Sequence, residues 1–298
     1  MKKHENKLFQ FICLRILFFI VKLSPLKLSH WLAQRLGSLS FKALKARRDL
    51  TVENIRNARK YNFLTVDVTD EQLARKAWQN LCLLGLEFAY YENSVTKIRQ
   101  AVRLEGKENL EHVLTKQKGV VLITLHLGNW ELMGTALAMA GFKVNSISKI
   151  QTNGLVNQYI NNYRRSHGIN PIPKTKFLRP VVEAFQRNEG VAFFIDQADT
   201  HRGIPIHMFG RKAMIPRGAA EFALRLDKPV VFVYIIREGL NKHTLVISEE
   251  IPLIRSGNYE NDLLNNTAAF AGMIQSVIQR YPEQWLWMHK FWDNKILV

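Results

Sequence analysis

The chain has little cysteine, and its apolar runs are interrupted by charges. Only Cys13 and Cys82 occur among 298 residues, which argues against a disulfide framework, and no Cys/His spacing is typical of a metal site. Two isolated thiols suit a reducing compartment. The nine prolines are scattered, and there is no Ser/Gly-rich linker, low-complexity tract or fixed-period repeat. Composition therefore indicates no division into separately linked domains.

Acidic residues are also scarce relative to basic ones. Asp and Glu number 25 against 42 Lys and Arg, and the formal net charge is +17. A positive field of this kind favours an anionic partner, although charge alone would equally suit a soluble basic protein or a nucleic-acid binder. No helix-turn-helix, zinc or aromatic-strand signature is present, so a nucleic-acid partner is not expected.

The most apolar segment is 8–23, and the basic residues within and before it are Lys2, Lys3, Lys7, Arg15 and Lys22. A signal peptide would need an uninterrupted core and a small-residue cleavage site. A spanning helix needs ~20 residues with few charges. Arg15 and Lys22 share one helical face, which predicts a helix lying in the membrane interface with these cations among lipid phosphates. We expect residues 1–25 to form a membrane-anchoring helix; the alternative is a buried core helix.

Residues 26–298 are expected to form one α/β domain. Helical patterns over 26–61 and 70–93 precede an alternation of strands and helices. Strands are expected near 101–105, 119–125, 143–149, 170–173, 191–195, 229–236 and 243–249, and helices near 107–115, 129–140, 154–167, 178–187, 217–226 and 261–280. This order predicts a central mixed, largely parallel sheet flanked by helices, with ligands at the carboxyl ends of strands.

The segment 120–131 carries the clearest chemical signal. A buried strand pattern delivers His126 into a turn at Gly128, and Glu131 follows at a helix start. On one continuous helix these two side chains would lie about 140° apart, but a bend at Gly128 would let them converge. Asn129 is a good N-cap, and an ionised Glu131 would then orient His126 as a general base. A lone histidine at a strand end can equally be a hydrogen-bonded structural residue.

The His-x4-Glu spacing resembles the signature of the glycerolipid and lysophospholipid acyltransferase superfamily. With residues 105–110 and Gly119, the string His-Leu-Gly-Asn-Trp-Glu is more narrowly similar to the bacterial lipid A late acyltransferases of the lauroyl/myristoyl type. Four motifs in order, spread over residues 30–292, carry this resemblance.

Two of the later motifs supply candidate binding residues. A second buried strand ends at Asp196 and Gln197, and a Phe-Gly-x5-Pro-x-Gly loop at 209–218 leads into a helix. Such a loop presents backbone amides and the positive end of a helix dipole to an anion. The candidate substrate-binding residues of this loop are Gly210, Arg211, Lys212 and Arg217. Arg217 stands where the family often has threonine, which leaves its individual role open.

The remaining motifs lie at 161–168 and 281–292. The superfamily carries a functional arginine near the first, and counting back from Gly168 favours Arg164, with Arg165 as a second binding candidate. The Pro-Glu-Gln-x-x-Trp segment at the second resembles the family's terminal motif. We expect Trp287 in the core, a mixed core and lipid-facing role for Trp285 and Trp292, and a structural role for His289.

The resemblance implies an enzyme that moves a fatty acyl chain from an acyl carrier protein or coenzyme A thioester to a hydroxyl of an anionic lipid A precursor. It implies His126, Glu131 and Arg164 as catalytic residues and Asn129 among the binding residues, with no metal or cofactor. Oxyanion donors would be amides near Gly128 and Asn129, or Arg164. The expected location of the protein is the cytoplasmic face of the inner membrane. The alternatives are a glycerolipid acyltransferase and a non-enzymatic basic peripheral membrane protein.

Overall fold

The computed structural model describes residues 2–92 and 94–292, and the side chains from 7 to 292 except 93 and 176. The side chains of Lys2 and Lys3, and the last six residues of the predicted 26–298 domain, lie outside the described part. All seven predicted strands are present and form one sheet in the order β1-β9-β8-β2-β5-β3-β4. These strands are β1 (Val102–Glu105), β2 (Val120–Thr124), β3 (Val144–Ser148), β4 (Ile169–Pro173), β5 (Gly190–Phe194), β8 (Val230–Gly239) and β9 (Lys242–Glu250).

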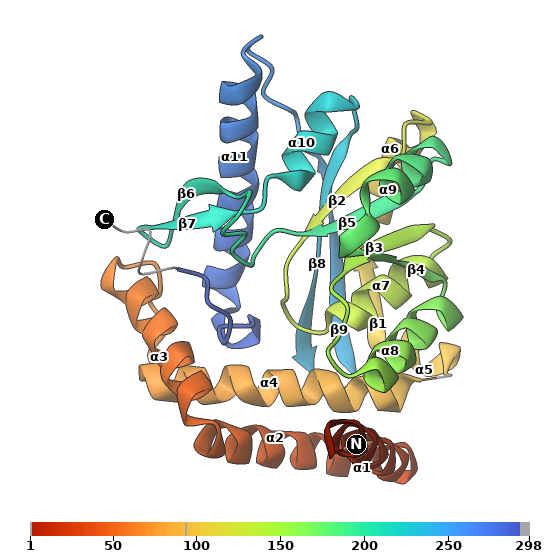
Figure 1. The fold of residues 1–298 in the computed structure, drawn as a ribbon, viewed down its shortest axis with the longest axis vertical. Helices are drawn as coiled ribbons and strands as arrows, with labels where there is room; N and C mark the ends of the chain where they lie inside the picture. Colours follow the sequence, from red (N-terminus) through yellow and green to blue (C-terminus); the bar gives the residue numbers. More distant parts are fainter. Residues whose placement is uncertain (1, 93, 293–298) are drawn as a thin grey trace.

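The sheet is mixed and mostly parallel, as predicted. Neighbouring strands pair in parallel except β8 and β9, which form an antiparallel hairpin. Every residue of β2 is buried, as expected for a parallel strand that is covered by helices on both faces. Figure 1 shows β2 and β5 near the centre of the sheet, where their carboxyl ends lie together.

Helices flank this sheet. The predicted helix over 26–61 is two helices, because the chain leaves helical geometry at Leu44 (φ −96°, ψ 66°). A short helix, α5, was not predicted. The helices are α1 (Lys2–Leu23), α2 (Leu26–Ala43), α3 (Lys45–Lys60), α4 (Asp70–Tyr91), α5 (Val95–Ala101), α6 (Lys107–Thr115), α7 (Trp130–Met139), α8 (Gly154–Ser166), α9 (Leu178–Gln186), α10 (Gly218–Arg225) and α11 (Tyr259–Arg280).

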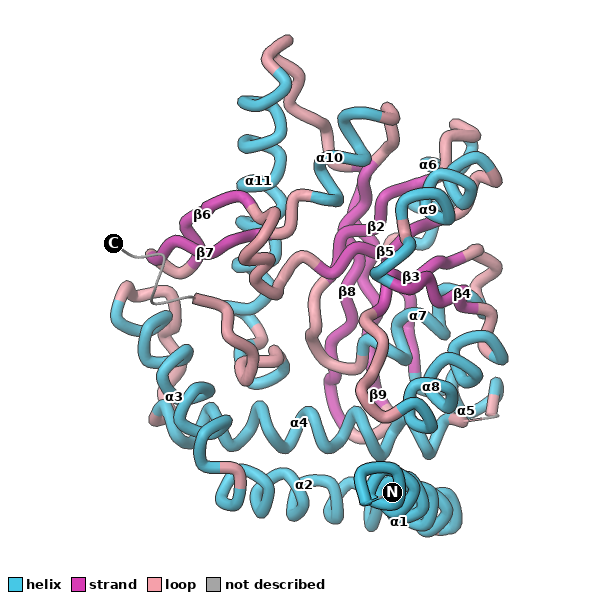
Figure 2. Tube along the Cα trace, viewed as in Figure 1, coloured by secondary structure: helices cyan, strands magenta, loops and turns pink. Residues whose placement is uncertain are grey.

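The segment expected to be a loop at 209–218 is largely a strand. β6 (Ile204–Met208) and β7 (Arg211–Ile215) form an antiparallel hairpin beside α11, visible in Figure 2. Phe209 and Gly210 make its two-residue turn with φ of 53° and 74°, the positive angles that short hairpin turns require. Arg211 and Lys212 therefore lie on β7.

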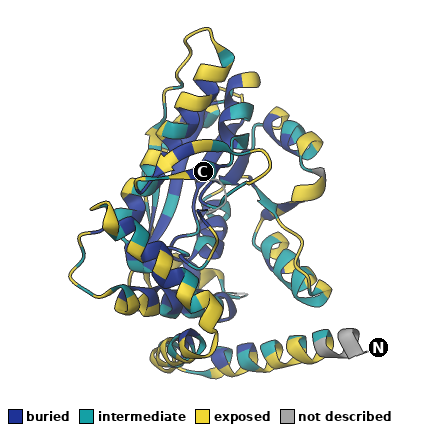
Figure 3. Ribbon diagram, turned by 60° about the vertical axis from the view of Figure 1, so that its left-hand side comes forward, coloured by how far each residue is buried: buried dark blue, intermediate teal, exposed yellow. Residues whose placement is uncertain are grey.

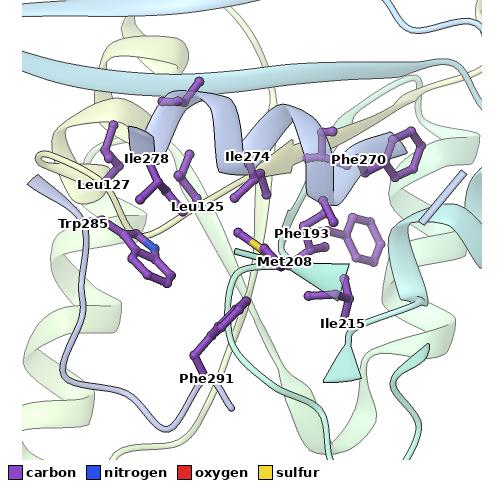
Figure 4. Close-up of a cluster of buried hydrophobic side chains, with 14 of the residues drawn as sticks. Leu125, Leu127, Phe193, Met208, Ile215, Phe270, Ile274, Ile278, Trp285 and Phe291 are labelled. Carbon is purple, nitrogen blue, oxygen red and sulfur yellow. The ribbon is translucent and has the colours of Figure 1, made fainter. Parts of the chain in front are cut away.

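A large hydrophobic cluster joins this hairpin, α11 and the C-terminal segment to the sheet. Figure 4 shows Trp285, Met208 and Ile274 among its buried side chains. Trp285, Trp287 and Trp292 are 2%, 1% and 6% exposed, so the expected lipid-facing role for Trp285 and Trp292 is wrong. The tryptophans act instead as core, and they anchor the chain that follows α11.

Helix α1 lies against α4 and α8 at the base of the domain, where Figure 3 shows it extending with an exposed outer face. The expected contact of Arg15 and Lys22 with lipid phosphates stays a prediction, and both cations also have a partner within the protein. Arg15 stacks over the Tyr159 ring at 4.7 Å, and Lys22 pairs with Glu92. Tyr159 lies on α8 and Glu92 directly follows α4, and Arg15 remains exposed to solvent beside Tyr159.

The exposed surface of α1 is mostly apolar. Its large exposed hydrophobic residues are Leu8, Phe9, Ile12, Ile16, Phe19, Ile20 and Leu23, and α2 adds Leu28, Trp31 and Leu39. We call these ten residues the apolar stripe. Within the described residues, no helix combines the length and hydropathy needed to cross a membrane.

Candidate active site

The site forms where β2 and β5 end. Thr124 of β2 lies opposite Phe194 of β5 in the parallel register, so the second residue after each strand, His126 and Asp196, falls at the same level of the sheet edge. Open α/β sheets bind ligands at this edge. Strand pairing, and not proximity in sequence, brings these two side chains together.

Asp196 holds His126 at two points. Its Oδ1 lies 2.8 Å from His126 Nδ1, and its Oδ2 accepts a hydrogen bond from the His126 backbone N–H at 2.7 Å. Burial opposes ionisation of Asp196, but the facing His126 and the hydrogen bonds from His126 and Trp285 outweigh it and keep the pKa below its ordinary value. An ionised Asp196 accepts from Nδ1–H, which leaves Nε2 unprotonated and able to take a proton.

The C-terminal segment completes this arrangement. Trp285 Nε1 donates to Asp196 Oδ2 at 2.8 Å, and Leu127 pairs with Trp285 as an antiparallel bridge. The backbone N–H of Leu286 donates to the His126 carbonyl at 3.2 Å. The sequence motif at 281–292 indicated that this segment mattered, but nothing in it pointed to the Asp196 contact.

The expected contact between Glu131 and His126 is not what the structure shows. Glu131 lies in the first turn of α7 and binds Arg164 of α8, with Arg164 Nε 3.0 Å from Oε2 and Nη2 2.5 Å from Oε1. The reason is that α7 directs Glu131 toward the end of α8, while Asp196 already occupies His126 Nδ1. Asp196, and not Glu131, therefore orients the imidazole.

Of the two arginine candidates, only Arg164 reaches this region. Its side chain is 16% exposed and its partner Glu131 11% exposed. Arg165 is exposed and lies 3.4 Å from Asn162 on its own helix. Arg164, the favoured functional arginine, is thus the one of the two that points inward, and its functional role stays a prediction.

Gly128 and Asn129 make the bend from β2 into α7. Gly128 has φ +58°, and a Cβ there would lie 2.5 Å from the Ile235 carbonyl oxygen, so both conformation and space require glycine. Asn129 caps α7 as predicted, with its Oδ1 accepting from Leu132 N–H at 3.0 Å.

Asn129 and the Gly128 amide are nevertheless not free for substrate. The Asn129 side chain is 1% exposed, and its Nδ2 donates to Glu87 Oε2 at 2.9 Å. The Gly128 N–H donates to the Gln284 carbonyl at 3.1 Å. The expected binding role of the Asn129 side chain and the expected oxyanion role of the Gly128 amide are therefore replaced by structural ones.

Asp196 also differs from its expected substrate-binding role. Asp196 is 2% exposed, so its carboxylate serves His126 and Trp285. Gln197 follows it, and its Nε2 lies 3.3 Å from His126 Nδ1. Gln197 is half-buried at the site's edge, and its contact with substrate stays a prediction.

The hairpin residues make contacts of their own. A Cβ on Gly210 would meet the Tyr61 ring at 2.5 Å, Arg211 lies over the Trp292 ring at 5.6 Å, and Arg217 Nε lies 3.2 Å from Glu221. Exposed Lys212 faces His207 across the hairpin. The hairpin supports the site through its turn, since Phe209 packs on Trp285 with ring centroids 6.0 Å apart. Substrate binding by these four residues stays a prediction.

A small cavity of about 30 Å³ lies between the sheet and α7. Its wall is mostly apolar, and the Glu131–Arg164 pair forms its charged part. The lining residues are Leu122, Thr124, Trp130, Glu131, Met133, Gly134, Leu137, Val144, Ser146, Arg164, Ile169, Ala192, Phe194 and Val233. Trp130 and Phe194 also flank the His126 ring, with centroids 5.1 and 4.4 Å away, so the cavity adjoins the imidazole.

These groups suit proton transfer beside an apolar substrate. His126 can act as a base, Asp196 can stabilise its imidazolium, and Arg164 brings positive charge. Among the described residues, no three His, Cys, Asp or Glu side chains are grouped as metal ligands.

Comparison with known proteins gives a consistent assignment. A family model described as bacterial lipid A biosynthesis acyltransferase matches residues 3–294. The chain is 22% identical over 286 residues to the lipid A biosynthesis palmitoleoyltransferase of Escherichia coli, covering 93% of this chain and 88% of that protein. A lipid A biosynthesis acyltransferase of Shigella flexneri matches to the same extent.

Mycobacterial relatives match over shorter stretches. The phosphatidylinositol mannoside acyltransferase of Mycolicibacterium smegmatis is 23% identical over 190 residues, 62% of this chain and 60% of the relative. An enzyme of the same name from Mycobacterium tuberculosis (strain H37Rv) is 26% identical over 139 residues, and the chain spans 44% of its length. The expected family resemblance is thereby confirmed.

Proposed function

Because the chain belongs to the bacterial lipid A biosynthesis acyltransferase family, we propose that it transfers a fatty acyl chain from a thioester to a hydroxyl of a lipid A precursor. Family and relatives together make it an acyltransferase of lipid A or related glycolipid biosynthesis. The donor, the acceptor and the residue roles below are our proposal. The observation that carries the mechanism is the Asp196 carboxylate bound to His126 Nδ1 at 2.8 Å.

His126 acts as the general base. Nε2 takes the proton from the acceptor hydroxyl as its oxygen attacks the thioester carbonyl carbon. The carbon–sulfur bond then breaks, and the imidazolium returns the proton to the departing thiolate. Asp196 stabilises the imidazolium during this transfer, as a buried carboxylate does for a catalytic histidine.

Arg164 stabilises the oxyanion of the tetrahedral intermediate. Its Nε and Nη2 bind Glu131, and we assign the remaining Nη1 hydrogens to the developing negative charge. Glu131 then has a positioning role: it holds the guanidinium in one orientation beside the cavity. Preorganised donors of this kind contribute about 2.7–4 kcal/mol in other acyl-transfer sites.

The apolar cavity beside Trp130 receives the acyl chain. Hydrocarbon prefers a wall of buried Leu, Val, Ile and Phe side chains over water, and this wall continues from the Glu131–Arg164 pair into the sheet. The thioester carbonyl would then sit at the charged end of the cavity, next to His126.

We propose that the apolar stripe rests on a lipid surface, with α1 and α2 lying in the interface. Removing uncharged apolar side chains from water supplies the attraction, and the net charge of +17 adds attraction to anionic lipids. The proposed location is the cytoplasmic face of the inner membrane, where acyl carrier protein and coenzyme A thioesters are available.

Vesicle sedimentation tests this placement. Phe19 on the stripe is 62% exposed and Leu178 on α9 is 60% exposed, so Phe19→Glu and Leu178→Glu each add one charge at a similarly exposed site. We expect about 10-fold weaker binding to anionic vesicles for Phe19→Glu, because burial of a Phe side chain is worth ~1.5–3 kcal/mol, and little change for Leu178→Glu. Equal losses would refute the assignment of the stripe.

A second candidate acceptor is a phosphorylated glycolipid of another type, which the similarity to the phosphatidylinositol mannoside acyltransferases favours. The same His126, Asp196 and Arg164 would serve it. Only an assay of acyl transfer to each acceptor distinguishes a lipid A precursor from another phosphorylated glycolipid.

Mass spectrometry of lipid A decides the proposed function. Cells expressing the protein should contain lipid A heavier by a fatty acyl unit, and cells expressing His126→Ala should not. Purified enzyme with acyl carrier protein and coenzyme A thioesters would then identify the donor. Unchanged lipid A together with acylation of another glycolipid would favour the second candidate, and no transfer to any glycolipid would refute the proposal.

A further inference from the structure

A buried ion pair lies behind the loop that carries His126. Glu87 of α4 and Arg237 of β8 pair through two contacts, with Arg237 Nε 2.9 Å from Oε1 and Nη2 2.6 Å from Oε2. Their side chains are only 2% and 8% exposed. Burial would raise the pKa of Glu87, but Arg237 and the nearby His30 hold it well below the ordinary value, so the pair is ionised.

The pair connects directly to the bend after β2. Glu87 Oε2 accepts from Asn129 Nδ2 at 2.9 Å, and Asn129 caps the helix that carries Glu131. One carboxylate oxygen thus links the ion pair to the start of α7.

A second connection runs through Gln284. Its Oε1 accepts from the Arg237 backbone N–H at 2.7 Å, and its Nε2 donates to the Arg237 carbonyl at 2.9 Å. Its own carbonyl accepts from Gly128 N–H and from Asn80 Nδ2, and Asn80 Oδ1 in turn accepts from Arg237 Nη1. Both residues after Leu127 are therefore tied to the same ion pair.

Other groups that face Glu87 do not replace these links. His30 Nε2 lies 3.3 Å and His243 Nε2 3.5 Å from Oε1. Burial lowers the pKa of His243 to about 4, which keeps it neutral near pH 7. Arg237 is thus the fixed positive partner.

Such a pair is a costly way to obtain stability. Desolvation of two buried charges offsets most of their attraction, and apolar residues of similar volume often stabilise a fold as well or better. A fully bonded polar network instead fixes one geometry. Here that geometry belongs to the segment between the candidate base and Glu131.

We propose that Glu87 and Arg237 are positioning residues for acyl transfer, which fix His126 and the Glu131–Arg164 pair by holding Gly128 and Asn129. This inference rests on the proposed function. Displacement of a catalytic group by about 1 Å can cost about 100-fold in rate, so small movements of the bend should be visible in kcat.

A reciprocal exchange tests the proposal. Asn129→Asp keeps the helix cap, since Asp caps as well as Asn, but it sets a second carboxylate against Glu87. Glu87→Gln removes the charge that Arg237 and Asn129 share. The double variant Glu87→Gln/Asn129→Asp restores one carboxylate and one amide across the same gap with the donor reversed.

We expect each single variant to lower kcat by at least about 10-fold with KM within about 2-fold, and the double variant to recover most of kcat. Val181→Ala is the control for stability loss, because Val181 is fully buried and belongs to α9, outside the bend. The Val181→Ala variant should have a lower melting temperature but a normal kcat.

Three outcomes overturn the inference: normal kcat in both single variants, no recovery in the double variant, or a kcat loss that follows melting temperature along one line with Val181→Ala. His126→Ala separates this result from the proposed function. Full activity of His126→Ala refutes the proposed base, whereas an inactive His126→Ala with normal Glu87→Gln refutes only the positioning role.

Discussion

Asp196→Asn should remove most activity while it leaves the fold in place. Asp196 Oδ2 accepts two hydrogen bonds, from His126 N–H at 2.7 Å and Trp285 Nε1 at 2.8 Å. An asparagine must place its carbonyl oxygen there to keep both bonds. Its NH₂ group then faces His126 Nδ1 and donates to it, so the imidazole carries its proton on Nε2, where the base needs a lone pair.

The magnitude follows from these contacts. Turning the amide over to restore Nδ1–H would leave two buried donors without an acceptor, at about 1–3 kcal/mol each. The wrong tautomer therefore predominates, and loss of general-base catalysis is worth ~10²–10⁴-fold in kcat. We expect a fall of that size with little change in KM.

The assay is steady-state acyl transfer, with the melting temperature measured alongside. Asp262→Asn is the matched control, since Asp262 is a buried carboxylate that accepts hydrogen bonds from Ser256 and belongs to α11. Its variant should keep kcat. If Asp196→Asn keeps normal kcat, then Asp196 does not control the tautomer and the mechanism is refuted.

Three further predictions concern stability and acyl chain length. Gly128→Ala should destabilise the protein by more than the ~1–2 kcal/mol that a positive φ costs, because the new Cβ would meet the Ile235 carbonyl oxygen. Gly141→Ala, at φ +98° with open space around it, should lose only that conformational contribution; urea unfolding measures both variants, and equal losses would contradict the close approach at Gly128. Ala192→Leu should shift acyl preference toward shorter chains because Ala192 lines the cavity, and an unchanged chain-length profile with intact activity would remove the acyl chain from that cavity. His243, which has a pKa of about 4 when folded, takes up a proton near pH 6.5 when unfolded. Because the folded protein does not bind this proton until about pH 4, stability should fall by about 3 kcal/mol as the pH is lowered from 6.5 to 4. His243→Gln should flatten this part of the stability–pH profile, and an unchanged slope would refute the prediction.

The sequence predicted the strands well because their apolar patterns are strong and local. All seven strands of the main sheet lie where β-branched and apolar runs predict them. The β6–β7 hairpin was missed because Pro205 and basic residues mask a short alternation. The break at Leu44 was missed because neither Gly nor Pro marks it.

The candidate site was predicted in part. His126 and the cap at Asn129 follow from a local pattern, and Arg164 follows from the family resemblance. The pairing of Asp196 with His126 depends on β5 lying beside β2 in a register that no local pattern encodes. Glu131 was assigned to His126 because it is near in sequence, whereas α8 offers it a guanidinium. Glu87 and Arg237 lie 150 positions apart, so only the folded chain shows their partnership.

The bond between the His126 loop and the C-terminal segment has a consequence for synthesis of the protein. Gln284, Trp285 and Leu286 bind Gly128, Asp196 and His126. These contacts can form only after about 160 residues beyond position 126 have been synthesised. At ~5–20 residues per second, that delay lasts on the order of ten seconds or more. A nascent chain can pair β2 with β5 during this interval, but its imidazole has no fixed partner geometry. The site can therefore be completed only after Trp285 and Leu286 have been synthesised, and a chain that stops before Trp285 should be inactive.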